Sequence, residues 1–198
     1  MAKDTKNRIL EHALVLFSEN GYRGTNLREL AASLNLSKSG LYRHFESKEH
    51  LWNTLMDRME DYYTEHFGSA ERLPLMPRSC AELYEMTMSM IRFTVHDPQI
   101  ILTRKLLLTE QFRDERAKRL AARHFLEGTR AMYAKIFASM MDAGLLKRSD
   151  PEMTALAFTA PVTVLIHECD REPENEARVM AAIDAFVKQF ISEHEQKA

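Results

Sequence analysis

The stretch Thr25–His50 reads TNLRELAASLNLSKSGLYRHFESKEH and carries the clearest structural signals of the chain. Its first half predicts a short helix, because a hydroxyl side chain suited to an N-cap, Thr25, precedes a regular apolar pattern. Asn35 then favours the left-handed conformation of a sharp helix exit, and Ser37 suits the cap of a second helix. The apolar residues of the first helix recur every three or four positions, at Leu27, Leu30, Ala31 and Leu34.

The second helix is predicted over Lys38–Phe45, where Leu41 and Phe45 are apolar and one turn apart. These two residues mark its buried side, since successive side chains are about 100° apart around a helix. The opposite side then carries small, hydroxylated and basic residues, which allow the backbone to approach base edges in the major groove of DNA. We expect Lys38, Ser39, Gly40 and Arg43 near bases, and Thr25, Tyr42, His44 and Lys48 on phosphates.

A third helix is predicted to begin after Ser47, which supplies an N-cap, followed by Lys48 and Glu49. The exposed N–H groups of its first turn and the Lys48 ammonium would together suit a phosphate. An ordinary pair of helices with no role in nucleic-acid binding would have the same spacing. The pattern alone therefore leaves both interpretations open.

The run SLNLSKSGLYRHFESKEHL resembles the DNA-binding segment of the TetR (tetracycline repressor) family. The family's form S-K-x-x-L-Y-x-H-F, followed by x-x-K-E-x-L, is matched by Ser37, Lys38, Leu41, Tyr42, His44, Phe45, Lys48, Glu49 and Leu51. Upstream, ILEHALVLFSENGYRGTNLRELA resembles the family's first helix and its Phe-x-x-x-Gly-Tyr exit. The resemblance covers roughly the first quarter of the chain. Two residues depart from it: Asn35 stands where many members have Gly, and Gly40 where Thr is frequent.

This resemblance implies an all-α protein with an amino-terminal three-helix DNA-binding domain at residues 1–50. A helix over residues 48–67 would link it to a helical ligand-binding and dimerisation domain at residues 51–198. The implied function is that of a ligand-responsive transcriptional regulator, with a repressor as the expected form. An activator of the same architecture, and a helical small-molecule-binding or scaffold protein that never engages DNA, are the alternatives.

The implied partners are double-stranded DNA, a small and largely apolar or aromatic effector, and a second copy of the chain. A homodimer would hold two recognition helices about 34–36 Å apart, so that both half-sites of a palindromic operator are read. An effector bound among the central helices would tilt the helix over residues 48–67 and thereby change that spacing. The resemblance implies no cofactor.

Helical periodicity and capping signals predict about nine helices over the whole chain. Besides the two short helices, the expected ranges are about Thr5–Glu19, Lys48–Phe67, Ser79–His96, Asp97–Leu108, Arg113–Ala143, Asp150–Cys169 and Glu174–Glu193. The segment Leu73–Ser79, with Pro74 and Pro77, is expected to be a loop. No run of period-two alternation and no hairpin turn signal appears, so the predicted fold class is all-α.

The last two predicted helices are strongly apolar. One carries Leu156, Ala157, Ala160, Val164 and Leu165, and the other Val179, Ile183, Phe186, Val187 and Phe190. In proteins of the TetR kind the last two helices pair with their symmetry mates in a four-helix interface. We therefore expect a homodimer through these helices, with burial inside a single subunit as the alternative.

Soft and bulky side chains in the middle of the chain suit a pocket for an apolar or aromatic molecule. The candidate ligand-binding residues are Met86, Met90, Phe93, His124, Gly128, Met132 and Phe158. Ordinary core packing explains each of them as well, and His124 could be a buried histidine with its hydrogen bonds satisfied. A glycine inside a helix costs about 1 kcal/mol relative to alanine, so Gly128 indicates close approach by another helix or by a ligand.

The overall charge is nearly balanced, with 27 Lys and Arg against 29 Asp and Glu and a net charge of −2. The protein is therefore not a polybasic nucleic-acid binder. The first 50 residues carry eight Lys and Arg against six Asp and Glu. This excess agrees in sign with a DNA-facing end but is too small to carry the argument.

The remaining sequence signals are negative. No signal peptide and no membrane-spanning run is recognisable, so a cytoplasmic protein is expected. Cys80 and Cys169 form no C-x-x-C pair and are expected to be free thiols, with a disulfide as the alternative. No catalytic residue and no metal site is expected, because His167-Glu168 begins an H-E-x-x-H motif that Arg171 leaves incomplete. No G-x-S-x-G, P-loop or G-x-G-x-x-G occurs.

Overall fold

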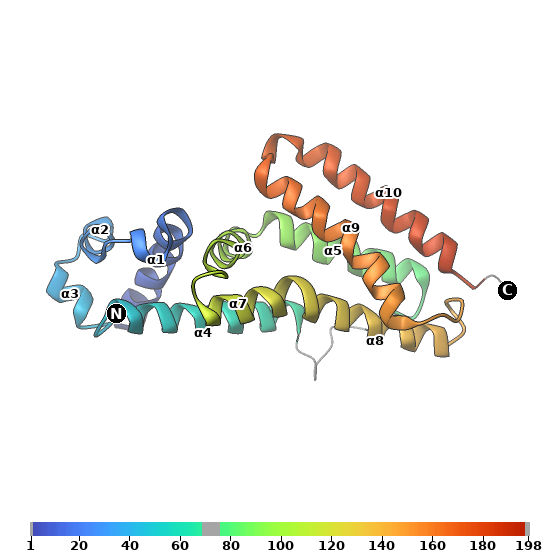
Figure 1. The fold of residues 1–198 in the computed structure, drawn as a ribbon, viewed down its shortest axis with the longest axis horizontal. Coiled ribbons are helices and arrows are strands. Elements are labelled where there is room, and N and C mark those ends of the chain that lie inside the picture. The colour runs from blue at the N-terminus through green and yellow to red at the C-terminus, as the bar shows by residue number, and fades with distance from the viewer. Residues whose placement is uncertain (1, 69–75, 197–198) are drawn as a thin grey trace. The chain divides into compact units, whose positions relative to one another are not determined.

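Helices make up the regular structure of the part of the chain that the computed structural model describes, residues 2–68 and 76–196 (Figure 1). The α-helices are α1 (Ala2–Gly24), α2 (Leu27–Ser33), α3 (Lys38–Tyr42), α4 (Lys48–Phe67), α5 (Cys80–His96), α6 (Pro98–Glu110), α7 (Glu115–Ala122), α8 (Gly128–Asp142), α9 (Pro151–Arg171) and α10 (Glu176–His194). A π-helical segment, Arg123–Glu127, joins α7 to α8, and a 3₁₀ turn, Pro173–Asn175, precedes α10. The all-α prediction is confirmed. Of the predicted loop Leu73–Ser79, the part before Met76 lies outside the described residues.

The helices form two compact units. The first comprises residues 1–66 and 98–121, and the second residues 67–97 and 122–198. The predicted division at residue 50 therefore does not coincide with the packing. The reason is that α4 buries its apolar face within the first unit, where the Trp52 ring lies 5.3 Å from that of Phe17 in edge-to-face contact.

The end of α1 differs from the prediction. Helical residues continue to Gly24, but the backbone leaves the helical conformation at Gly21, where φ is 69° and ψ is 172°. Thr25 does not cap α2. Its hydroxyl points back and donates a 2.8 Å hydrogen bond to the Gly21 carbonyl, while the neighbouring Asn26 accepts the capping hydrogen bond from the Arg28 N–H. Thr25 and Asn26 can both act as N-caps, and in the structure Asn26 does so because the Thr25 hydroxyl is bonded to the end of α1.

The turn between α2 and α3 follows the sequence signals closely. Asn35 has a φ of 55°, and the N–H groups of Leu36 and Asn35 donate to the carbonyls of Ala31 and Ala32, as in a Schellman motif. Ser37 caps α3 by accepting from the Gly40 N–H at 3.0 Å. The predicted helix exit at Asn35 and the predicted Ser37 cap are confirmed.

The predicted helix over 113–143 is not one regular α-helix. It consists of α7, the π-helical segment and α8, and the Gly128 N–H donates to the carbonyl of Arg123, five residues earlier. A Cβ at Gly128 would lie 2.3 Å from that carbonyl oxygen. The backbone of its own helix therefore makes the close approach that Gly128 indicated.

The core of the second unit is built by α5, α8, α9 and α10. Aromatic rings meet at its centre, where the Phe158 ring centre lies 4.8 Å from those of Tyr133 and Phe190 with the ring planes tilted. The predicted apolar stripe of α10 lies within this core: Val179, Ile183, Val187 and Phe190 are buried, and Phe186 packs partly buried against them. These α10 side chains therefore pack inside the subunit, and a homodimer through other faces of the last two helices stays a prediction.

Candidate nucleic-acid interface

Helix α3 is held by the two apolar residues that the sequence indicated. Leu41 and Phe45 are both buried, and they pack in a unit whose other buried side chains include Leu30 of α2 and Phe17 of α1. The helix is shorter than predicted and ends at Tyr42. Its exit is a tight turn, because the N–H groups of His44 and Phe45 both donate to the Leu41 carbonyl.

The opposite side of α3 faces solvent. Lys38, Ser39 and Arg43 are exposed, and Gly40 is half-buried beside the Ser37 cap. Ser39 shares a 3.0 Å hydrogen bond with the Ser37 hydroxyl. The result is a short helix whose outer side presents one hydroxyl and two long cations next to bare backbone, which is the surface that readout of base edges requires.

Tyr42 and His44 lie on the flanks of this surface. Tyr42 is 39% exposed, and the Lys38 ammonium lies 5.6 Å from the centre of its ring. This cation–π geometry keeps the phenol and the ammonium together at the end of the helix. His44 is half-buried. Both side chains lie where a phosphate beside the groove could be contacted.

The structure gives Lys48 and Thr25 roles that the sequence did not reveal. The Lys48 ammonium donates a 2.6 Å hydrogen bond to the Thr25 carbonyl and lies 4.7 Å from the Tyr22 ring centre. Burial lowers the pKa of Lys48, and the negative charge of Glu110 acts in the opposite direction. Lys48 thus ties the start of α4 to the junction of α1 and α2. Thr25 is only 5% exposed and its hydroxyl is engaged, so the structure gives no support to a phosphate contact from it.

Two further basic residues were missed. Arg28 is exposed in the first turn of α2, where free N–H groups and the helix dipole also favour an anion. The Lys6 ammonium of α1 lies 5.3 Å from the Phe45 ring centre, next to the exit of α3. Identifying Asn26 as the cap would have shown that Arg28 belongs to a first helical turn.

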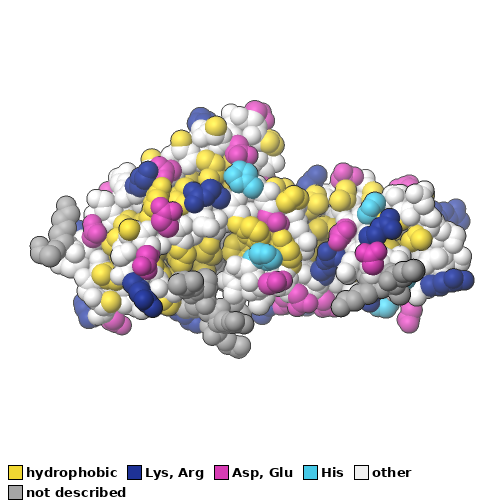
Figure 2. Space-filling view, turned by 180° about the vertical axis from the view of Figure 1, so that it is seen from behind, with side chains coloured by type: hydrophobic (Ala, Val, Ile, Leu, Met, Phe, Trp, Pro, Cys, Tyr) yellow, Lys and Arg dark blue, Asp and Glu magenta, His cyan; other side chains and the backbone are white. Residues whose placement is uncertain are grey.

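Charges of both signs are interspersed over the face drawn in Figure 2. That face has no continuous field of one sign, in agreement with the nearly balanced composition. The exposed cations Arg28 of α2 and Lys38 and Arg43 at α3 are local positive charges of the kind that attract an anion.

Several of the seven candidate ligand-binding residues belong to the packed core of the second unit. Met132 and Phe158 are buried in the core of the second unit, and Met86 and Met90 pack against that core. Phe93 of α5 lies beside Phe67, with ring centres 5.7 Å apart. A ligand among these side chains would have to displace packed neighbours.

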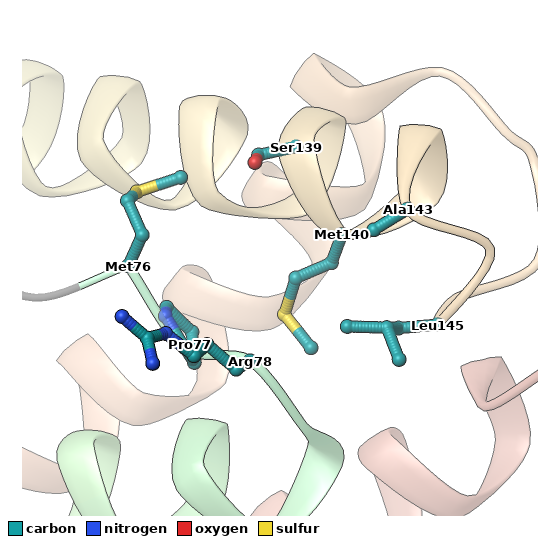
Figure 3. A pocket seen from close by; sticks show the side chains of 7 residues that line it. All are labelled: Met76, Pro77, Arg78, Ser139, Met140, Ala143 and Leu145. Carbon is teal, nitrogen blue, oxygen red and sulfur yellow. The ribbon is translucent and has the colours of Figure 1, made fainter.

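A pocket of about 490 Å³ opens elsewhere in the second unit (Figure 3). The residues that line it come from the segment before α5 and from the end of α8 and the turn after it: Met76, Pro77, Arg78, Ser139, Met140, Ala143 and Leu145. None of the predicted ligand-binding residues is among them. The pocket combines thioether and aliphatic walls with the guanidinium of Arg78 and the hydroxyl of Ser139.

His124 lies in the π-helical segment and is 2% exposed. Burial, together with the neighbouring positive charge of Arg123, lowers its pKa from 6.5 to about 4. The histidine is therefore neutral in the folded protein near neutral pH. This burial agrees with the interpretation of His124 as a core histidine.

The pKa shift of His124 predicts a loss of stability in mild acid. Because the folded-state pKa lies below the unfolded value, stability is fully present above pH 6.5 and is lost as pH falls from 6.5 towards 4. Between about pH 7.5 and about pH 5 the protein should lose about 2 kcal/mol through this residue. Urea unfolding of wild type and His124→Gln at both pH values measures it. An equal loss in both proteins would show that His124 is not responsible.

Among residues 2–68 and 76–196, no helix is long and apolar enough to cross a membrane. The same residues contain no group of three or more His, Cys, Asp or Glu side chains placed to hold a metal ion. Cys80 and Cys169, both within these residues, are not joined by a disulfide.

An all-α chain whose amino-terminal helices form this turn and present this polar helix is a helix-turn-helix protein. Residues 9–55 match the family model of bacterial regulatory proteins of the tetR family. Among curated proteins, the negative transcriptional regulator IcaR of the biofilm operon icaADBC is similar. The chain is 42% identical over 57 residues to IcaR of Staphylococcus aureus and 36% identical over 58 residues to that of Staphylococcus epidermidis. Each match covers 29% of this chain and only 31% of the relative.

Solved structures share the fold over nearly the whole chain. A TetR transcriptional regulator from Chloroflexus aurantiacus superposes with a TM-score of 0.77 at 20% identity, covering 100% of this chain and 98% of the other. SmeT, the repressor of the Stenotrophomonas maltophilia multidrug efflux pump SmeDEF, gives 0.68 at 16% identity, covering 98% and 91%. Residues 9–55 thus match the tetR family of bacterial regulatory proteins, and the whole chain shares the fold of solved TetR-family regulators.

Proposed function

We propose that this protein is a ligand-responsive transcriptional regulator, in the form of a repressor, that binds a palindromic operator in double-stranded DNA as a homodimer. The observation that carries the proposal is the two-sided character of α3, with Leu41 and Phe45 buried and Lys38, Ser39 and Arg43 exposed. The names of IcaR as a negative regulator and of SmeT as a repressor support the repressing form. Since operator DNA lies in the bacterial cytoplasm, the proposal places the protein there, and it includes no catalysis.

In the proposed complex, α3 enters the major groove. Lys38, Ser39, Gly40 and Arg43 lie near base edges, because they occupy the side opposite the buried anchors. Tyr42 and His44 bind phosphates, and Arg28 adds a phosphate contact at the start of α2. Lys48 acts mainly by holding the junction of α1 and α2, with its remaining N–H donors directed to a phosphate.

The contact assignments predict distinct effects of two substitutions. Arg43→Ala should weaken operator binding by about tenfold to a hundredfold and relax the sequence preference, because a contact to a base edge is lost. Tyr42→Phe should weaken binding to all DNA sequences by similar, smaller factors. Fluorescence anisotropy with DNA from the region upstream of the gene and with random-sequence DNA, over a series of salt concentrations, measures both.

Arg148→Ala is the matched control, since Arg148 is an exposed arginine of the second unit that pairs only weakly with Asp142 at 3.6 Å. It should bind DNA like the wild type. If the wild-type protein binds neither the upstream DNA nor the random-sequence DNA at low salt, the regulator proposal fails. The alternative function, that of a helical small-molecule-binding or scaffold protein, then replaces it. A reporter gene under the operator then separates a repressor from an activator.

The proposed dimer interface uses the faces of α9 and α10 that the subunit leaves uncovered. These two helices pack side by side (Figure 1). The exposed small and apolar residues are Met153, Leu156, Ala157, Ala160 and Val164 on α9, and Ala177, Ala181, Ala182 and Ala185 on α10. On α9 they recur at the spacing of one helical face, and alanines allow helices of two subunits to approach closely.

The proposed effector is a small molecule with a largely apolar or aromatic body. The pocket at Arg78 and Met140 offers it an open site of a size typical for ligands. The predicted site around Met132 and Phe158 would require rearrangement of packed side chains. An effector that binds one conformer better than the other by 1–3 kcal/mol would change operator affinity about 5–150-fold.

A further inference from the structure

Glu110, the last residue of α6, is a buried carboxylate that the DNA-binding surface does not use. It is only 2% exposed, and its Oε1 accepts a 3.1 Å hydrogen bond from the backbone N–H of Tyr22. A glutamate is rarely buried to this extent unless a partner compensates for its lost hydration. The partner here is backbone at the point where α1 changes direction.

That point is shaped to receive the carboxylate. Gly21 breaks the helical conformation immediately before Tyr22, and a Cβ at Gly21 would lie 2.5 Å from the same Oε1 atom. Only a residue without a side chain leaves room for Glu110 there. The conformation of Gly21 and the position of Glu110 therefore depend on each other.

The segment between this break and α2 is held from two sides. Glu110 of α6 binds its first N–H, at Tyr22, while Lys48 of α4 binds its last carbonyl, at Thr25. The Tyr22 ring lies between them, 5.0 Å from the Trp52 ring and 4.7 Å from the Lys48 ammonium. Tyr22–Thr25, the residues between the break in α1 and the cap of α2, are thus bonded to other helices at both ends.

Glu110 is also the residue at which α6 turns towards α7. Its carbonyl accepts the N–H groups of Arg113 and Asp114, at 2.8 and 2.9 Å. Asp114 in turn accepts the N–H of Ala117 and so caps α7. A displacement of this turn would move the Glu110 backbone, and through its side chain the chain entering α2.

We propose that Glu110 is a positioning residue. By accepting the Tyr22 N–H it fixes the direction in which the chain enters α2, and thereby the orientation of the helix pair α2–α3 that would contact DNA. The inference rests on the proposed function for its DNA readout. It also has a readout that requires no DNA, namely exchange of the Tyr22 amide hydrogen, which is protected only while the acceptor is in place.

Three substitutions of Glu110 separate the effect of its side-chain length from the effect of its negative charge. Glu110→Gln keeps an oxygen at the same distance and loses the charge, whereas Glu110→Asp keeps the charge and is one methylene too short. Glu110→Ala loses both. We expect Tyr22 amide exchange in the Asp and Ala variants to be at least about tenfold faster than in wild type, and the Gln variant to stay within about threefold. Glu115→Gln, at an exposed carboxylate of α7 that pairs with Lys118, is the control without effect.

Operator binding then distinguishes positioning from loss of stability. In the Asp and Ala variants the helix pair α2–α3 is less firmly oriented, so binding to the two-half-site operator should be at least about tenfold weaker than in wild type. Binding to random-sequence DNA should stay within about twofold of wild type. The Gln variant should bind the operator with the affinity of the wild type. The measurements are made well below the melting temperature of each variant.

Two results would overturn the proposal. One is wild-type exchange and wild-type operator affinity in the Asp variant. The other is a parallel fall of operator binding, random-sequence binding and melting temperature, which is what simple destabilisation produces. If the wild-type protein binds no DNA, the proposed function fails, and Tyr22 exchange together with Trp52 emission decides whether Glu110 orders this segment.

Discussion

Val164→Glu is expected to leave the protein monomeric at micromolar concentration. Val164 lies on the outer face of α9 and is 67% exposed in a single chain, so the substitution should cost an isolated subunit at most about 0.5 kcal/mol. In the proposed interface the new carboxylates would be buried without partners, at a cost of about 3–5 kcal/mol. Sedimentation velocity of the purified protein measures the change.

The loss of the dimer should carry over to DNA. A monomer presents one recognition helix, so the gain from binding two half-sites together, about a hundredfold or more, disappears. Operator affinity should fall by this factor while the salt dependence of random-sequence binding changes little. Far-ultraviolet circular dichroism should remain that of the wild type, because the substituted side chain faces solvent within the subunit.

Leu126→Glu provides the matched control for Val164→Glu. Leu126 belongs to the same unit, is 63% exposed and gains the same charge, but it lies in the π-helical segment, away from α9 and α10 in the sequence. It should remain dimeric. A dimer that survives Val164→Glu but dissociates in Leu126→Glu would place the interface elsewhere, and a monomeric wild type would remove the two-half-site argument altogether.

Local signals explain why much of the amino-terminal fold could be predicted. Asn35 and Ser37 act through their own backbone neighbours, so their effects do not depend on the rest of the molecule. The bounds of α4, Lys48–Phe67, agree with the prediction for the same reason, since a serine cap precedes it and a glycine follows. Leu41 and Phe45 were identified because a short helix with two apolar residues has only one possible buried side.

The features that sequence reasoning did not reveal depend on contacts between distant segments. Periodicity showed that α10 has an apolar stripe, but not whether the same chain or a second copy covers it. Lys48 has the sequence context of a phosphate ligand, and only the three-dimensional structure brings its ammonium onto the Thr25 carbonyl. Glu110 gave no signal at all, because a glutamate at the end of a helix is normally exposed.

The ligand site shows the same limit more strongly. The search for methionine and aromatic side chains identified residues that belong to the core, such as Met132 and Phe158. The pocket instead forms where the segment before α5 meets the end of α8. Its lining residues are separated by about sixty positions and share no periodicity. Composition can therefore indicate an adaptable interior, but not where that interior is open.

Gly21→Ala is expected to be strongly destabilising, by about 2–6 kcal/mol. A φ of 69° with a ψ of 172° belongs to a region that essentially only glycine adopts, and forcing an alanine into it costs about 1–3 kcal/mol. The new methyl group would also lie 2.5 Å from Glu110 Oε1. Glu110 would have to withdraw from the Tyr22 N–H and leave it unsatisfied, which adds about 1–3 kcal/mol.

Urea unfolding measured by fluorescence tests this value directly, because Trp52 is the single tryptophan of the chain and its ring lies beside that of Tyr22.

Gly144→Ala is the matched control, since Gly144 also has a positive φ, of 72°, but a methyl group there would meet nothing within 4 Å. It should lose only the backbone cost, about 1–2 kcal/mol. The Glu110 contact is measured by combining Gly21→Ala with Glu110→Ala. The cost of Gly21→Ala should shrink in that background, because the methyl group then has no carboxylate to displace. Equal losses at the two glycines would contradict any coupling between Gly21 and Glu110.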